Sequence, residues 1–190
     1  MGRPREHDET TRARLLRVAG ALVEAEGVEG LSLRRLARRA DTTTRAIYSL
    51  FESKEGLLAA MYHEMAAAMA AHHEAVPVSE DVTEELLALA LAYRASALLH
   101  PTLYPLMVLK GGAPLPEDVA LARRGFERVV ETFARGVRAG VFRRGAESMG
   151  RQLFALVHGL TTCELAGMLG ARPKRAWREA VSAMLRGFAA

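Results

Sequence analysis

Apolar side chains recur every three or four positions along most of the chain, which is the spacing of one face of an α-helix. Alternating runs rich in β-branched residues, the usual mark of strands, do not occur in the sequence. Glycine and proline fall mostly between the apolar runs, where helices are expected to end. The pattern therefore predicts an all-α protein of about nine helices. The expected helices cover residues 9–26, 33–40, 44–50, 53–76, 81–100, 101–112, 116–140, 147–170 and 173–188.

Between residues 32 and 58 the expected helices are short and closely spaced. Ser32, Thr43 and Ser53 stand at the starts of three of them, where a hydroxyl can accept a hydrogen bond from a free backbone N–H group. Asp41 begins the turn between the first two, since aspartate tolerates left-handed backbone angles. Helix, turn and helix in this order indicate a unit that lays its second helix in the major groove of DNA. We expect a helix-turn-helix DNA-binding domain over residues 1–56 and a second helical domain over residues 57–190.

The expected second helix of this unit carries side chains suited to reading DNA. An arginine can donate two hydrogen bonds to guanine, and hydroxyls can bond to bases or phosphates. The helix N-termini at Ser32, Thr43 and Ser53 also offer backbone N–H groups to phosphates. The side chains expected on the exposed face of the second helix are those of Thr43, Thr44, Arg45, Tyr48 and Ser49.

Arginines are concentrated around this unit, Arg34 among them, and Asp41 is the only acid between residues 33 and 50. The solvated face of an ordinary helical bundle can also carry an arginine cluster, but the cap spacing and Tyr48 together favour DNA binding. The N-terminal arm is short and basic and contains Arg3 and Arg5. Similar arms of other helix-turn-helix proteins insert arginines into the minor groove, so we expect Arg3 and Arg5 to contact DNA there. A merely disordered terminus is the alternative for this arm.

These residues resemble the DNA-binding motif of the TetR family of bacterial transcriptional regulators. The family pattern is roughly small-Gly-Val-Ser-x-Gly-Thr-aliphatic-Tyr-x-x-Phe-x-Ser-Lys-Glu-x-Leu. The sequence departs from this pattern at Asp41, Thr42, Arg45 and Ala46 and keeps the rest of the motif. The matching residues are Ala40, Thr43, Ile47, Tyr48, Phe51, Ser53, Lys54, Glu55 and Leu57.

The resemblance assigns roles within the motif. Tyr48 and Lys54 would contact phosphates, and the residues around Thr44 and Arg45 would contact bases. The DNA partner implied by the family is a double-stranded operator with palindromic half-sites.

The remainder of the chain resembles the ligand-binding and dimerisation body of the same family. Residues 156–167 are similar to the Trp-His-Gly subgroup of C-terminal domains, with Val157 where the subgroup has Trp. The resemblance implies a homodimer closed through residues 147–188, where small residues such as Gly159 would permit close approach. The alternative is that the two apolar helices of this region pack only on each other within one chain.

The middle helices offer candidates for an effector pocket. Methionine adapts to varied apolar shapes, while tyrosine and histidine supply the few polar anchors that such pockets use. Side chains of these types at helical spacing also make up ordinary cores, so both interpretations stay open. The candidates are Met65, Met69, Tyr93, Leu103, Tyr104, Met107, Phe126, Val130 and His158.

Composition adds limits to this interpretation. A formal net charge of +4 and an isoelectric point near 9.6 suit a nucleic-acid binder. Cys163 is the sole cysteine, so an intrachain disulfide is excluded. The N-terminus has no apolar signal core, and the most apolar stretch, residues 86–99, contains Arg94 and is too short to span a bilayer. We expect a cytoplasmic protein without a membrane partner.

Enzyme motifs are incomplete in the sequence. Residues 63–67 begin like a zinc-protease motif, but Ala67 stands where the second histidine is required. We therefore expect neither catalysis nor a cofactor. The hypothesis that the family implies is a ligand-responsive homodimeric repressor, released from its operator by a small, largely apolar effector. An architectural DNA-binding protein without an effector is one alternative. A redox sensor built on Cys163 is another, although a cysteine in an apolar helical stripe is usually inert.

Overall fold

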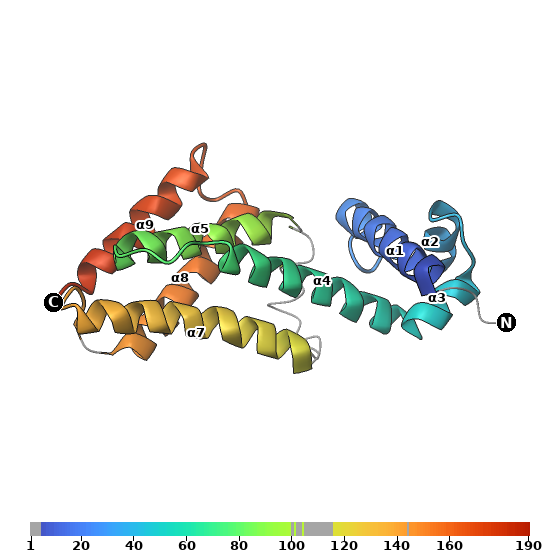
Figure 1. Cartoon of the computed structure of the whole chain (residues 1–190). Helices are drawn as coiled ribbons and strands as arrows, with labels where there is room; N and C mark the ends of the chain where they lie inside the picture. Colours follow the sequence, from blue (N-terminus) through green and yellow to red (C-terminus); the bar gives the residue numbers. More distant parts are fainter. Residues whose placement is uncertain (1–4, 100, 102–103, 105–115, 144) are drawn as a thin grey trace. The chain divides into compact units, whose positions relative to one another are not determined.

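The computed structural model describes residues 5–99, 101, 104, 116–143 and 145–190. These residues form eight α-helices and no strand, with an isolated antiparallel bridge between Phe142 and Ala189, so the expected all-α fold is confirmed. The helix expected over residues 101–112 lies outside the described residues, apart from Pro101 and Tyr104. The helices of Figure 1 are α1 (Arg5–Glu26), α2 (Leu33–Arg39), α3 (Thr44–Phe51), α4 (Lys54–Glu74), α5 (Val82–Leu99), α7 (Pro116–Arg138), α8 (Ala146–Leu165) and α9 (Pro173–Gly187).

Two helix ends differ clearly from the expected ones. α1 begins at Arg5 rather than at residue 9, because nothing in residues 5–8 breaks a helix and Pro4 directly before it suits a helix start. α8 ends at Leu165 rather than at Gly170. The reason is that Gly167 adopts a φ of +72°, a left-handed angle that ends helices and that glycine reaches without a steric penalty.

The chain divides into two compact units, one of residues 1–65 with 100–115 and one of residues 66–99 with 116–190. In the first unit α1 packs against both α2 and α3. α4 belongs to both units, since the division falls between Met65 and Ala66. The fully buried residues of the first unit recur along α1 at intervals of three and four, so they lie on one face of the helix, as the apolar pattern predicts. They include Leu15, Ala19, Leu22, Val23, Leu36, Ile47 and Leu57.

In the second unit α5 packs against α7, α8 and α9, and α7 packs along α8. Figure 1 shows these four helices gathered into a bundle. Trp177 and Val181 of α9 are fully buried, so the apolar stripe of α9 faces the interior of its own chain. The ring of Phe133 lies 5.4 Å from that of Phe142 and 5.8 Å from that of Phe188, which closes one end of the bundle. None of the helices in the described part of the chain has both the length and the apolar character of a membrane span.

Candidate nucleic-acid interface and effector region

The turn between α2 and α3 is built as the sequence predicts. Asp41 adopts a left-handed φ of +48°. Thr43 occupies the N-cap of α3, and its side-chain oxygen accepts a hydrogen bond from the Ala46 N–H at 3.2 Å. Ala37 and Ala40 are buried, so α2 and α3 approach each other without large side chains between them. The turn therefore fixes which face of α3 is turned outwards.

α3 is strongly two-sided. Ile47 and Phe51 are buried and hold the helix on the core of the first unit. On the opposite side Tyr48 is 54% exposed, a large exposure for an aromatic side chain and one that suits a residue with a binding role. The predicted contact residues share this outward side, with Thr44 half-buried and the others exposed. They are Thr43, Thr44, Arg45, Tyr48 and Ser49.

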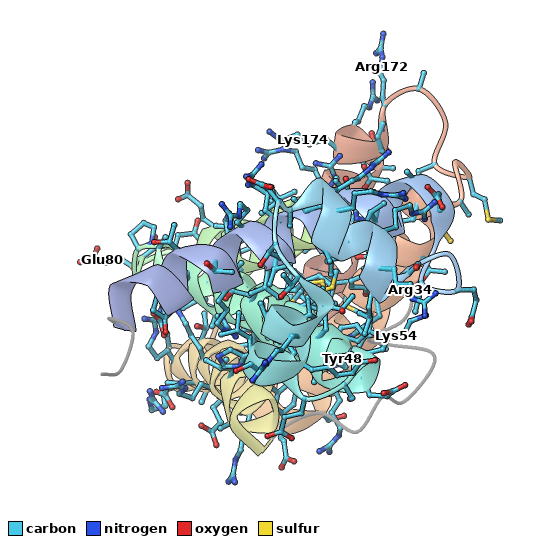
Figure 2. All side chains as sticks on the ribbon, turned by 90° about the vertical axis from the view of Figure 1, so that its right-hand side faces the viewer. Arg34, Tyr48, Lys54, Glu80, Arg172 and Lys174 are labelled. Atoms are coloured by element: carbon cyan, nitrogen blue, oxygen red, sulfur yellow. The ribbon has the colours of Figure 1, made fainter. Side chains whose placement is uncertain are left out.

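The start of α4 lies directly after this face. The Ser53 hydroxyl accepts a hydrogen bond from the Gly56 N–H at 3.0 Å, which confirms the predicted cap. Lys54 is the first residue of α4 and is half-buried. In the view of Figure 2 the labelled side chains of Arg34, Tyr48 and Lys54 gather in the same part of the first unit. Basic and phenolic side chains are therefore carried by the first turn of α2, by α3 and by the N-terminus of α4.

The N-terminus of α2 differs in detail from the prediction. Ser32 occupies the N-cap and its carbonyl accepts a hydrogen bond from the Leu36 N–H at 2.8 Å, but its side chain makes no capping bond. The Ser32 backbone is in the extended region (φ −106°) and its residue surface is exposed, so the hydroxyl is open to solvent. The predicted position of the Ser32 cap is therefore confirmed, but the hydrogen bond expected from its side chain is not formed.

The arginines of α2 divide into two groups. Arg34, a predicted contact, is exposed. Arg35 instead forms an ion pair with Glu26 at the end of α1 and donates a hydrogen bond to the Gly30 carbonyl at 2.8 Å. Arg35 therefore ties α2 to α1, a role that the arginine spacing alone could not distinguish from DNA contact.

The predicted N-terminal arm is shorter than expected. Arg3 lies outside the described residues, and Arg5 is already the first residue of α1. Arg5 therefore extends a helix rather than a flexible arm, and its side chain is outside the described part of the structure.

The second unit brings together four of the predicted effector residues. The hydroxyl of Tyr93 on α5 lies 3.0 Å from Nε2 of His158 on α8, within hydrogen-bond distance. On α7, Phe126 and Val130 both face Gly150 of α8, where an added Cβ would lie 3.6 Å from the Phe126 ring and 2.9 Å from Val130. Glycine at position 150 thus lets α7 and α8 approach closely beside the Tyr93–His158 pair.

The other effector candidates are distributed differently. Met69 is half-buried on the part of α4 that belongs to the second unit. Met65 and Tyr104 are buried, but both belong to the first unit. Leu103 and Met107 lie outside the described residues.

Two aromatic residues that were not predicted extend the Tyr93–His158 pair. The ring of His73 on α4 lies 6.3 Å from that of Tyr93. The ring of Phe154 on α8 lies 4.2 Å from that of His158 and 6.2 Å from that of Phe126. We call these five rings, His73, Tyr93, His158, Phe154 and Phe126, the aromatic row. Phe154 could have been suspected from sequence, since it stands one turn before His158 on the same helix.

A buried carboxylate lies between α5 and α7. The Glu85 side chain is 1% exposed and accepts hydrogen bonds from the Ser79 N–H at 2.9 Å, from Arg135 at 2.6 Å and from Thr132 at 3.2 Å. Arg128 also pairs with it at 3.6 Å. Burial by itself would raise the pKa of Glu85, but these hydrogen bonds and the charge of Arg135 outweigh burial and lower its pKa.

Two further features bear on the alternatives, namely metal-binding side chains and Cys163. Within the described residues no group of three or more histidine, cysteine or acidic side chains is arranged to hold a metal ion. Cys163 is half-buried on α8 and has a free thiol, and an intrachain disulfide is impossible because the sequence has no second cysteine.

The sequence matches two family profiles that together span most of the chain. The profile "Bacterial regulatory proteins, tetR family" matches residues 15–61, which hold α2, α3 and the start of α4. The profile "Tetracyclin repressor-like, C-terminal domain" matches residues 86–188, more than half of the chain. No curated protein matches the sequence at a significant level.

Solved structures of similar fold agree with the profiles. A Rhodococcus sp. RHA1 protein of unknown function is 30% identical, with 95% of this chain and 96% of that chain aligned at a TM-score of 0.79. The TetR family transcriptional regulator PfmR from Thermus thermophilus is 24% identical, with 91% and 97% aligned at a TM-score of 0.76. A TetR variant from Acinetobacter baumannii AYE, solved with minocycline, is 20% identical, with 91% and 93% aligned at a TM-score of 0.64. The chain therefore belongs to the TetR family, whose members are DNA-binding transcription regulators and not enzymes.

Proposed function

We propose that the chain is a homodimeric repressor that binds a palindromic operator and leaves it when a small effector binds the helical body. The observation that carries the proposal is the outward face of α3, whose exposed Arg45, Tyr48 and Ser49 stand beside Lys54 at the start of α4. An exposed arginine and hydroxyls on a helix held by a rigid turn are suited to the major groove. We propose functional boundaries of residues 1–56 for DNA binding and 57–190 for the effector and the dimer.

Lys54 and Arg45 are proposed to act differently on DNA. Replacing Lys54 with Ala removes a phosphate contact, so we expect weaker binding to all DNA sequences and a salt dependence shallower by roughly one unit of slope. Replacing Arg45 with Ala removes a base contact, so we expect a loss of preference for the operator of roughly 1–3 kcal/mol. Salt titrations on an operator and on unrelated DNA measure both effects. An unchanged slope for Lys54→Ala would contradict its role, while Arg35→Ala serves as a control that removes an arginine paired within the protein.

The remaining contacts follow from the same surface. Tyr48, Thr43 and the α2 N-terminus at Ser32 are proposed to bond to phosphates, and Thr44 and Ser49 to lie against bases. Arg34 adds positive charge beside them. Arg3 and Arg5 complete the proposed set, from the N-terminal end of the chain.

Dimerisation is proposed through the outward faces of α8 and α9. On α8 and its C-cap the exposed positions Ala155, Gly159, Thr162 and Ala166 recur at intervals of three and four, so small side chains form one stripe. α9 has the same spacing at Ala176, Ala180, Ala183 and Gly187, which are half-buried or exposed. Because Trp177 and Val181 already pack inside the chain, these small-residue stripes, and not the apolar stripe of α9, are the surfaces we assign to a partner.

Gly159 tests the dimer without disturbing the fold of one chain. An added Cβ at Gly159 would meet nothing within 4 Å, and leucine favours a helix more than glycine does. Gly159→Leu should therefore leave the subunit folded and, by overpacking the interface, raise the dimer dissociation constant about tenfold or more. Sedimentation velocity measures the change, with Ala122→Leu on the exposed side of α7 as control. Equal association of both variants would place the interface elsewhere.

The effector is proposed to bind in the body near Tyr93, Phe126, Val130 and His158. Met65, Met69, Leu103, Tyr104 and Met107 remain the further proposed lining residues. The solved Acinetobacter relative holds minocycline, which supports a small-molecule effector here. A ligand can shift the protein between DNA-binding and released states only as far as it prefers one of them. We propose that α4 carries the change, since it continues from Lys54 in the DNA-binding unit to Glu74 in the body. The similarity of residues 156–167 to the Trp-His-Gly subgroup stays a prediction.

A further inference from the structure

The aromatic row runs from the interior of the second unit to its surface, since Tyr93 is buried, His73, Phe126 and His158 are half-buried, and Phe154 is 49% exposed. Its members come from α4, α5, α7 and α8, which lie far apart in the sequence. Nε2 of His73 is buried and has no hydrogen-bond partner among the described residues. A buried imidazole nitrogen without a partner loses the hydrogen bond that water would give it, so a ligand that bonds to it gains that bond. A polar ligand group would therefore gain a hydrogen bond at Nε2 of His73 without displacing a partner in the protein.

The surroundings of His73 are positively charged. Burial is the largest effect on its pKa and lowers it, and the charges of Arg128 on α7 and His72 on α4 lower it further. Burial also lowers the pKa of His158 at the other side of Tyr93. Both imidazoles are therefore neutral at pH 7 in the absence of a ligand. An anion beside His73 would favour its protonated form, whereas a cation would be repelled by Arg128.

Two buried or nearly buried carboxylates of the second unit are paired with arginines. Glu85 on α5 pairs with Arg135 at 2.6 Å and with Arg128 at 3.6 Å. Glu164 on α8 accepts two hydrogen bonds from Arg94 of α5, the one from Nε at 2.8 Å. A cationic ligand would have to take one of these carboxylates from its partner, which is costly in a buried site. The charge balance favours a ligand that is negative.

We propose that the effector is an apolar monocarboxylic acid, with its hydrocarbon body along the rings of Tyr93, Phe126 and Phe154 and its carboxylate at His73 beside Arg128. This rests on the proposed function, because it names the ligand class of the proposed effector region. Aromatic faces accommodate an alkyl or aryl body, and a carboxylate accepts charge-assisted hydrogen bonds from imidazolium and guanidinium groups.

Such a ligand would act on the C-terminal end of α4 through Arg128. Arg128 donates hydrogen bonds to the carbonyls of His73 and Val76, at the C-terminal end of α4 and just after it. A positive charge at this end also stabilises the helix by interaction with its dipole. A carboxylate at His73 competes for the same guanidinium and so loosens the hold of α7 on the last turn of α4.

The first test compares apolar ligands of different charge on the whole 190-residue chain. Decanoate and 4-phenylbutanoate are titrated by calorimetry beside decanamide, decanol and decyltrimethylammonium. We expect the carboxylates to bind about tenfold or more tightly than the amide, as charged hydrogen bonds require. We also expect proton uptake at pH 7, seen as a difference between the heats in phosphate and Tris buffers. Equal binding of acid and amide, tighter binding of the cation, or no binding by either carboxylate would overturn the proposal.

The second test asks whether the carboxylate of the ligand binds at His73. His73→Phe keeps a buried ring and removes Nε2, so decanoate binding should weaken about tenfold and the proton uptake should fall, with decanamide unaffected. Arg128→Gln should weaken decanoate as well, and Arg123→Gln, at an exposed and paired arginine of the same helix, should not. Melting temperatures identify any variant that fails to fold. In that case Tyr93→Phe, which removes only the hydroxyl of Tyr93, replaces the failed variant as a change within the row. Decanoate that binds His73→Phe as tightly as the unmodified protein excludes this site.

Failure of this proposal and failure of the proposed function give different results. Operator binding and dimerisation are measured without any effector. If the operator is bound and the cation or the alcohol releases it while decanoate does not, the ligand class is wrong and the proposed function stands. If no operator is bound at all, the proposed function itself fails.

Discussion

Replacing Glu85 with Ala is expected to lower the free energy of unfolding of the second unit by about 3 kcal/mol, the lower end of the range for breaking a buried ion pair. The carboxylate is 1% exposed and is the shared partner of Arg128 and Arg135. Its removal leaves the guanidinium groups of Arg128 and Arg135, both on α7, without their shared carboxylate. The lower end of the range applies because their side chains are 23% and 27% exposed, so water screens part of the repulsion.

Urea unfolding followed by circular dichroism measures this change. Glu127→Ala is the matched control, since Glu127 forms an exposed pair with Arg123 on α7. An exposed pair of this kind contributes at most about 1 kcal/mol. If the Glu85 and Glu127 variants unfold at the same urea concentration, the buried cluster does not stabilise the body.

The same carboxylate should give the protein a characteristic dependence on pH. The pKa of Glu85 in the folded chain is below its ordinary value of 4.5, so its contribution to stability is present above pH 4.5 and is lost as the pH falls through the folded-state value. The pKa values of His73 and His158 are below the ordinary 6.5, so folding is opposed by their protonation as the pH falls below 6.5. Stability measured in urea should therefore fall in two steps, and Glu85→Gln should remove the more acidic one.

The DNA-binding unit could be predicted from sequence because its determinants are local. Thr43 and Ser53 bond to N–H groups three residues ahead, and Asp41 supplies a left-handed turn within one residue. Each of these devices is set by the type of residue and a short spacing, so one sequence is enough to recognise it.

The contacts of the body could not be predicted in the same way. Glu85 reaches Arg135 fifty positions away, and Tyr93 reaches His158 across sixty-five. Such pairings depend on how α5, α7 and α8 pack, and helical periodicity gives only the buried face of each helix. Glu85 was not predicted, although a carboxylate near the start of the most apolar helix requires a partner when it is buried. Arg35 shows the converse limit, since among neighbouring arginines of α2 only the fold reveals that this one pairs with Glu26.

Replacing Gly56 with Ala is expected to reduce operator affinity about tenfold or more and to destabilise the DNA-binding unit by about 1–3 kcal/mol. An added Cβ would lie 2.0 Å from the carbonyl oxygen of Phe51, closer than any rotamer change can relieve, because both atoms are fixed by the backbone. The end of α3 must then move away from the start of α4. Tyr48 and Lys54 stand on the two sides of this junction, so their spacing, which the proposed phosphate contacts require, changes with it.

Gly20→Ala separates this effect from the ordinary consequence of placing alanine in a helix. An added Cβ at Gly20 of α1 meets nothing within 4 Å, so the change should stabilise the unit by about 0.5–1 kcal/mol through lower backbone entropy in the unfolded chain. Its operator affinity should stay unchanged. Thermal unfolding and fluorescence anisotropy on labelled operator DNA compare the two variants under the same salt. If both variants bind the operator equally, the close approach at Phe51 does not position the DNA-contact residues. A stable Gly56→Ala protein with weakened binding would instead show that the α3–α4 junction sets the geometry of the DNA-contact surface.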